Sequence, residues 1–105
     1  MYVIVRKDLK PGLQLSQSCH AAMHFYFDYP KLTEDWIKNS DFIVILNIED
    51  EQKLQELLKT ANKLNIAASA FYEPDLNNEL TAIALAPCQM SKKLCRGLPL
   101  ALKTF

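Results

Sequence analysis

The chain has 105 residues, and because 12 lysines and arginines balance 12 aspartates and glutamates, its formal net charge at pH 7 is zero. Half of the residues are hydrophobic and 23% are charged, a composition that supplies a core and argues against a disordered chain. We expect one globular domain over residues 1–105. The longest apolar runs, residues 42–46 and 82–86, are far shorter than the roughly 20 residues that span a bilayer, so we expect no membrane partner.

The N-terminal half of the chain predicts a strand and two helices. Residues 2–6 are rich in β-branched and aromatic side chains, and the turn residues at 10–12 end the strand. Apolar residues at helical spacing then predict a helix over residues 13–29, which Pro30 ends. We interpret this stripe as facing the core; it comprises Leu15, Cys19, Ala22, Met23 and Tyr26. A short helix follows, capped by Thr33 and ending near residue 39.

The middle of the chain predicts two strands joined by a helix. Residues 41–48 form a continuous β-branched run, which favours an interior strand covered on both faces and central to the sheet. Asp50 or Glu51 opens an amphipathic helix over residues 52–64. Residues 66–72 return to strand character after a crossover long enough for a parallel βαβ unit.

The last third predicts a turn, a strand and a basic helix. Residues 73–78 have turn chemistry, residues 81–86 form the fourth strand, and Ser91 caps a helix through Arg96. This order predicts a three-layer α/β/α domain around a mixed four-stranded sheet. The short connection between the last two strands predicts that they are antiparallel.

The neutral total hides an uneven charge distribution. Residues 1–24 carry three cations and one acid, residues 25–80 carry five cations and eleven acids, and residues 81–105 carry four cations and no acid. If the two basic ends lie on one face, that face can meet phosphate. The alternative is ordinary solvated charge.

No metal or nucleotide cofactor is expected. His20 and His24 are four residues apart, but the HExxH pattern is absent and no second cluster of ligands follows. Only two glycines are present, so a phosphate-cradling loop cannot be built. The three cysteines, at positions 19, 88 and 95, are an odd number without CxxC spacing, which predicts core thiols in a reducing compartment. The apolar residues at the N-terminus precede the first cations, the reverse of a secretory signal, so we expect a cytoplasmic protein.

Three further residues each allow a structural and a functional interpretation. His20 either hydrogen-bonds a neighbouring loop or contributes to a site near the start of its helix. Asp75 either closes an Asx-turn or faces a cleft, and Thr81 is either a strand former or a site residue. A set of aromatic residues is either core or a stacking surface for bases; it comprises Phe25, Tyr26, Phe27, Tyr29 and Trp36.

Two N-terminal segments carry a family resemblance. Residues 2–12 read YVIVRKDLKPG, and residues 16–22 read SQSCHAA. They resemble the opening of the archaeal and eukaryotic type of peptidyl-tRNA hydrolases, often called type 2, in which the first strand ends in Arg-x-Asp-Leu and a Gly-Lys turn leads into a helix reading Ala-Ala-Gln-Cys-Ser-His-Ala. The resemblance extends over about residues 2–90, including the helix after residue 51 and the strand that ends at Pro87.

This resemblance implies a hydrolase that cleaves the ester between a peptide and the 3′ end of tRNA without a metal or cofactor. It assigns the family's glutamine and histidine to Gln17 and His20, and its threonine before the final strand to Thr81. The family's loop carboxylate corresponds to Asp75, with Glu73 as the competing assignment because the loop is shorter here.

One departure from the family pattern bears on activity. Leu13 occupies the position of the family's lysine at the head of the helix, and Lys10 is the cation nearest in sequence that could replace it. Two hypotheses follow: an ester hydrolase acting on peptidyl-tRNA or another acylated RNA, and a non-catalytic module that binds RNA or a protein. A small-molecule activity in the same cleft is a third. Apolar residues such as Phe25 and Phe27 also leave room for a homodimer.

Overall fold

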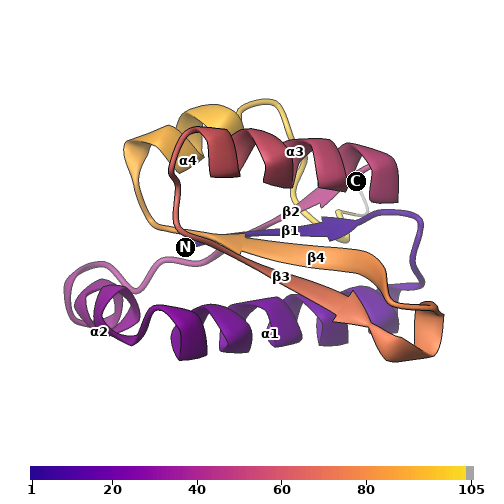
Figure 1. Ribbon diagram of the computed structural model, residues 1–105, viewed down its shortest axis with the longest axis horizontal. Helices are drawn as coiled ribbons and strands as arrows, with labels where there is room; N and C mark the ends of the chain where they lie inside the picture. Colours follow the sequence, from indigo (N-terminus) through magenta and orange to yellow (C-terminus); the bar gives the residue numbers. More distant parts are fainter. Residues whose placement is uncertain (104–105) are drawn as a thin grey trace.

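A computed structural model describes residues 1–103 as three layers, with a four-stranded sheet between two pairs of helices. Helices α1 and α2 cover one face of the sheet, and α3 and α4 cover the other (Figure 1). The strands are β1 (Tyr2–Arg6), β2 (Val44–Ile48), β3 (Ala68–Glu73) and β4 (Glu79–Leu85). The helices are α1 (Pro11–Asp28), α2 (Pro30–Asn39), α3 (Glu51–Lys63), the 3-10 turn η1 (Pro74–Leu76) and α4 (Gln89–Leu94). The predicted three-layer α/β/α fold is confirmed.

The sheet is mixed, with strand order β2-β1-β4-β3. Strands β1 and β2 are parallel, whereas β4 is antiparallel to both β1 and β3, as predicted for the last two strands. Strands β2 and β3 run in the same direction, so α3 is a parallel crossover, but β1 and β4 lie between the two strands that it joins.

The prediction that residues 41–48 form the central strand is wrong, because β2 starts at Val44 and lies at an edge. Its apolar character has another cause: the C-terminal segment, residues 99–102, runs along its outer side. The Asn47 amide donates to the Pro99 carbonyl at 2.9 Å, and the Ala101 amide donates to the Ile45 carbonyl at 2.9 Å. An edge strand that is covered in this way is as apolar as an interior one.

The predicted caps of two helices are also wrong. Helix α2 starts at Pro30, and the Thr33 hydroxyl lies inside the helix, where it donates to the Tyr29 carbonyl at 2.9 Å. Helix α4 has Cys88 at its N-cap, so Ser91 is a buried residue within it. By contrast, Asp50 caps α3 as expected, with its carboxylate accepting from the Lys53 amide at 3.0 Å.

Helix α1 turns the opposite face to the core from the one predicted. Leu15 and Met23 are 57% and 66% exposed, and Cys19 is exposed rather than packed in the core. The buried face carries mostly polar or small side chains, namely Gln14, Gln17, Ser18, Ala21 and Phe25. Each buried polar side chain has a hydrogen-bond partner within the molecule. Among residues 1–103, no buried side-chain nitrogen or oxygen is left without one.

Candidate functional site

Strand β4 has an irregularity at Thr81. In the pairing with β3, Phe71 lies opposite Ala82 and Tyr72 opposite Leu80, so Thr81 has no partner between them. The pairing of β4 with β1 also stops at Ala82. A bulge of this kind redirects the side chain of the extra residue. The fully buried Thr81 side chain is thereby free to contact α1.

The Thr81 hydroxyl starts a chain of hydrogen bonds that ends on a carboxylate. It donates to Oε1 of Gln17, a fully buried residue of α1. Gln17 Nε2 in turn donates to Glu73 Oε1 at 2.9 Å. The other carboxylate oxygen, Glu73 Oε2, accepts from the backbone amide of Asp75 at 3.2 Å. Three elements, α1, β4 and η1, therefore fix the orientation of one carboxylate at the end of β3.

These contacts also set the charge of Glu73. The hydrogen bond from Gln17 has the largest effect, and with the Asp75 amide and the nearby His20 imidazole it holds the pKa of the Glu73 carboxyl below its usual value. Partial burial acts in the opposite direction but does not prevail. The carboxylate therefore stays an anion further into the acidic range than an ordinary glutamate does.

His20 lies at the rim of this cluster. Its imidazole stacks on the ring of Phe71, with ring centroids 4.3 Å apart and the ring planes 7° from parallel. His20 is exposed, so one edge of the ring remains available to a ligand. Phe71 lies two residues before Glu73 on β3, and the stack thus places an imidazole beside the ionised carboxylate.

Asp75, the carboxylate expected from the resemblance, lies in the exposed turn η1. Among residues 1–103 its carboxylate has no hydrogen bond or ion pair with Gln17, His20 or Thr81, and its backbone amide is the group that contacts Glu73. The structure thus joins Gln17, Thr81 and the competing Glu73, with His20 at the rim.

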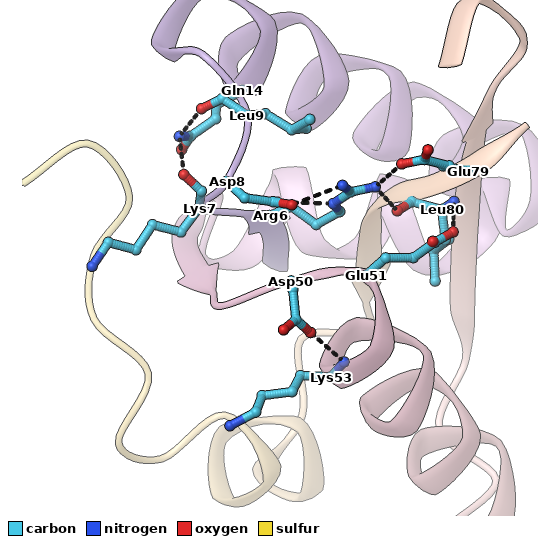
Figure 2. A network of polar contacts seen from close by, with 10 residues as sticks. All are labelled: Arg6, Lys7, Asp8, Leu9, Gln14, Asp50, Glu51, Lys53, Glu79 and Leu80. Carbon is cyan, nitrogen blue, oxygen red and sulfur yellow. Dashed lines mark hydrogen bonds and ion pairs between the residues drawn. The ribbon is translucent and has the colours of Figure 1, made fainter. Parts of the chain in front are cut away.

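A second polar network holds the residue before Thr81. The buried Arg6 guanidinium donates to Glu79 at 2.7 Å, to the Leu80 carbonyl at 3.2 Å and twice to Asp8 at 2.9 Å (Figure 2). Glu51, at the start of α3, accepts from the Leu80 amide at 2.9 Å. Side chains thus bond both backbone groups of Leu80, in the part of β4 that lies beyond the end of its pairing with β1. The sequence gives one sign of this network, the Arg-x-Asp spacing at the end of β1.

Residues 1–100 match the family described as Peptidyl-tRNA hydrolase PTH2. The chain belongs to this family. It is also similar to proteins named peptidyl-tRNA hydrolase from two strains of Methanococcus maripaludis, C6 and C7. Each is 24% identical over 95 residues, which cover 81% of this chain and 82% of the relative.

The head of α1 is where the family resemblance of the sequence leads us to expect a lysine, at the position of Leu13. Leu13 is half-buried, and Lys10, the N-cap residue of α1, is exposed. In the part of the chain that the structure describes, Lys10 forms no ion pair with Glu73 or Asp75. No lysine or arginine of residues 1–103 forms an ion pair with the site carboxylate.

The cations of the N-terminal and C-terminal segments lie close together at one place only among residues 1–103. Lys7 and Lys103 line one hollow of about 600 Å³ beside the start of α1, with Gln14 and Asn47 among its other lining residues. Lys92 instead lines a hollow with Met1 and Tyr2, at the opposite end of β1. One cation from each end therefore lies near the N-terminus of α1.

Within residues 1–103, no group of three or more histidine, cysteine, aspartate or glutamate side chains is arranged to hold a metal ion. No helix of the described chain has the length and hydropathy needed to cross a membrane.

Proposed function

We propose that this protein hydrolyses the ester bond between a peptide, or an acylated amino acid, and the 3′ end of tRNA. One observation carries the proposal: a carboxylate kept ionised and held by Gln17, which Thr81 in turn holds at a strand bulge. Membership of the peptidyl-tRNA hydrolase family supports the substrate class. The cysteine usage supports a cytoplasmic site of action.

The Glu73 carboxylate orients a water molecule and takes its proton as the water oxygen attacks the ester carbonyl carbon. The bond between that carbon and the 3′ oxygen of the ribose then breaks, and the oxygen leaves with a proton, giving a free peptide carboxyl group and a tRNA hydroxyl. Because the pKa of Glu73 is lowered, its carboxylate is a weak base, and positioning the water is its larger contribution.

His20 and Lys10 contribute around this centre. The His20 imidazole, held flat by Phe71, hydrogen-bonds the ester or the leaving oxygen at the rim. Lys10, exposed at the head of α1, meets a phosphate of the tRNA. Gln17 acts through Glu73 and Thr81 through Gln17, so both position the carboxylate.

We assign the catalytic carboxylate to Glu73 rather than Asp75, because only the Glu73 side chain contacts Gln17. In this assignment Asp75 supports Glu73 through its backbone amide. The Asp75→Asn variant keeps that amide and tests the alternative assignment directly.

The test measures release of tRNA from N-acetylated aminoacyl-tRNA by wild type, Glu73→Gln and Asp75→Asn. We expect wild-type turnover, a loss of about 100-fold or more in Glu73→Gln and a loss of less than about threefold in Asp75→Asn. A large loss confined to Asp75→Asn returns the catalytic role to Asp75. If wild type binds tRNA without releasing it, the protein is a non-catalytic RNA-binding module, an alternative that Leu13 in place of the family's lysine favours.

A further inference from the structure

The hollow of about 600 Å³ beside the start of α1 lies between that helix and the C-terminal segment. We call it the lysine hollow, because its two charged lining residues are Lys7, which follows β1, and Lys103, near the other end of the chain. Both lysines are exposed, and neither forms an ion pair with another residue of the described chain. The volume is typical of a site for a small organic molecule.

The lysine hollow is separate from the cluster around the Glu73 carboxylate. Gln14 lines the hollow, whereas Gln17 and His20 contact Glu73 and Phe71. At 100° per residue, Gln14 points about 60° away from Gln17 and about 120° away from His20 around the axis of α1. A ligand in the hollow therefore lies to one side of the groups that face the ester in the proposed mechanism.

The charges around the lysine hollow favour an anion. No aspartate or glutamate of residues 1–103 lines it, and the nearby Asp8 carboxylate accepts two hydrogen bonds from Arg6 at 2.9 Å. Figure 2 shows the Lys7 side chain extending away from that pair, toward the C-terminal segment. A neighbouring hollow also includes Lys7, but its other lysine is paired with a glutamate at 3.0 Å. Uncompensated positive charge therefore lies between Lys7 and Lys103.

The walls between the two lysines are largely apolar. Leu9 comes from the connection between β1 and α1, and Leu100 and Leu102 come from the C-terminal segment. Leu102 has a φ of +57°, a backbone conformation that leucine rarely adopts, and its amide donates to Asn47 Oδ1 at 3.3 Å. An aliphatic side chain gains from burial against such walls, whereas the phosphates of a nucleic acid do not.

Two buried amide side chains, Gln14 and Asn47, also line the lysine hollow. Gln14 donates to the carbonyls of Lys7 and Leu9 at 3.3 and 2.7 Å. Asn47 donates to the Val5 carbonyl at 3.2 Å and to Gln14 Oε1 at 2.9 Å. Each amide group has two N–H donors and both are used, but each oxygen keeps a lone pair beyond the bond that it accepts. These two side chains therefore offer a ligand acceptors rather than donors.

We propose that the lysine hollow binds an N-acylated amino acid or a short peptide through its free C-terminal carboxylate. The carboxylate lies between Lys7 and Lys103, an aliphatic side chain packs against the leucines, and an N–H group donates to Gln14 or Asn47. A phosphate diester has the charge but neither the aliphatic group nor the donor. Such a ligand is also the acyl product of ester hydrolysis, a link that rests on the proposed function, whereas the binding itself does not.

NMR titration of the ¹⁵N-labelled protein with up to roughly 10 mM ligand tests the proposal. N-acetylleucine has the carboxylate, the aliphatic group and the N–H. Its methylamide lacks the carboxylate, 4-methylpentanoate lacks the N–H, and inorganic phosphate lacks the aliphatic group. We expect N-acetylleucine to bind at least about tenfold more tightly than the methylamide and at least about threefold more tightly than 4-methylpentanoate. The amide signals of Leu9, Leu100 and Leu102 should shift.

Three exposed lysines provide matched variants. Lys7→Gln and Lys103→Gln remove the two charges of the lysine hollow, whereas Lys92→Gln removes a charge that lines a different hollow. Each of the first two should weaken binding of N-acetylleucine at least about threefold, and Lys92→Gln should change it less than about 1.5-fold. Circular dichroism confirms that all three variants remain folded.

The proposal is overturned if N-acetylleucine shifts no signal of the hollow, or if the methylamide binds as tightly. Inorganic phosphate that binds there as tightly as N-acetylleucine identifies a general anion site and also overturns it. Titration of the Glu73→Gln variant separates binding from the proposed hydrolysis. We expect this variant to bind N-acetylleucine as tightly as wild type does, even if wild type releases no tRNA. Loss of binding in Glu73→Gln would place the ligand at the carboxylate cluster and contradict the proposal.

Discussion

The imidazole of His20 lies flat against the phenyl ring of Phe71, with the ring centroids 4.3 Å apart. His24, one turn later on α1, meets the same ring at 5.4 Å and at an angle of 58°. The two histidines therefore contact the same side chain of β3 in different geometries. His20, the stacked one, is also the one that lowers the pKa of Glu73.

The two histidines should differ in their contribution to turnover. His20→Ala should lower kcat for N-acetylaminoacyl-tRNA by about 10- to 100-fold, because in the proposed mechanism it removes the group that hydrogen-bonds the reacting ester. His24→Ala removes a tilted contact with the same ring and serves as the control, with an expected change below about threefold. Comparable losses in the two variants would contradict a specific role for His20.

Replacing Gln17 should move the acidic limb of the pH-rate profile. The hydrogen bond from Gln17 is the main reason that the pKa of Glu73 is low, so Gln17→Met should raise that pKa. Because the proposed reaction requires ionised Glu73, the acidic limb of kcat/KM should shift to higher pH. NMR titration of the Glu73 carboxyl group, together with the rate profile, measures the shift; an unmoved limb would show that Glu73 does not control it.

The same pKa shift affects stability with a definite sign. A carboxyl whose pKa is lower in the folded protein stabilises it above the pKa of the unfolded chain, about 4.3 for glutamate, and loses this contribution as the pH falls through the folded value. Gln17→Met should therefore reduce the part of the unfolding free energy that disappears between neutral and acidic pH. Urea titrations at pH 7 and pH 3 separate this part from the loss of packing.

Arg6 should contribute more to the free energy of unfolding than a surface ion pair does. Its buried guanidinium holds Asp8, Glu79 and the Leu80 carbonyl, and Arg6→Met leaves the carbonyl without this donor. The two carboxylates are about 40% exposed and rehydrate, so we expect a loss of about 2–3 kcal/mol in urea unfolding. Lys53→Met, which breaks an exposed pair with Glu49, is the control and should leave the urea midpoint unchanged.

Restoring the family's lysine should raise activity. Leu13→Lys places an ammonium at the head of α1, where it can stabilise the developing oxyanion, a contribution worth about 10²–10³ in rate where a donor of this kind is well placed. We expect at least a tenfold gain in kcat, measured as release of tRNA, with Leu15→Lys as the control on the outward side of the same turn. A gain shared by both variants would point to general electrostatic attraction of tRNA.

The three cysteines should react unequally. Burial raises the pKa of the Cys95 thiol to about 11, so almost no thiolate forms at pH 8, whereas Cys19 and Cys88 are exposed. Iodoacetamide should label Cys19 and Cys88 in dilute native protein, and Cys95 only after unfolding in urea. Peptide mass spectrometry assigns the labels; rapid labelling of native Cys95 would contradict its burial.

The elements of the fold were predictable because they rest on local patterns, whereas their faces and neighbours were not. The predicted stripe has the period of a core-facing helix, and spacing alone cannot show that Leu15, Cys19 and Met23 face outward. Strand β2 is apolar except at Asn47 because the chain near Pro99 covers it, and contacts between segments so far apart leave no local pattern. Thr33 resembles a cap by residue type, yet Pro30 starts the helix earlier.

The residue types of the site were predictable from the family motifs, but its geometry was not. Gln17, His20 and Thr81 stand at the expected positions in the sequence, and whether each takes part in catalysis stays a prediction. The choice between Glu73 and Asp75 depends on which side chain points toward α1 where β3 ends and η1 begins. The backbone of the turn sets that direction. The residue types alone therefore do not decide which of the two carboxylates belongs to the site.

The segment after α4 has a consequence for how this protein can assemble. Leu100 pairs with Leu46, and the backbone groups of Ile45 and Asn47 that face outward from β2 are already bonded to Ala101 and Pro99. A strand of another chain finds these backbone groups already hydrogen-bonded and cannot pair with β2 there. The C-terminal segment thus protects an apolar edge from aggregation. Shortening the chain before Pro99 would uncover that edge, and aggregation by strand addition would then compete with folding.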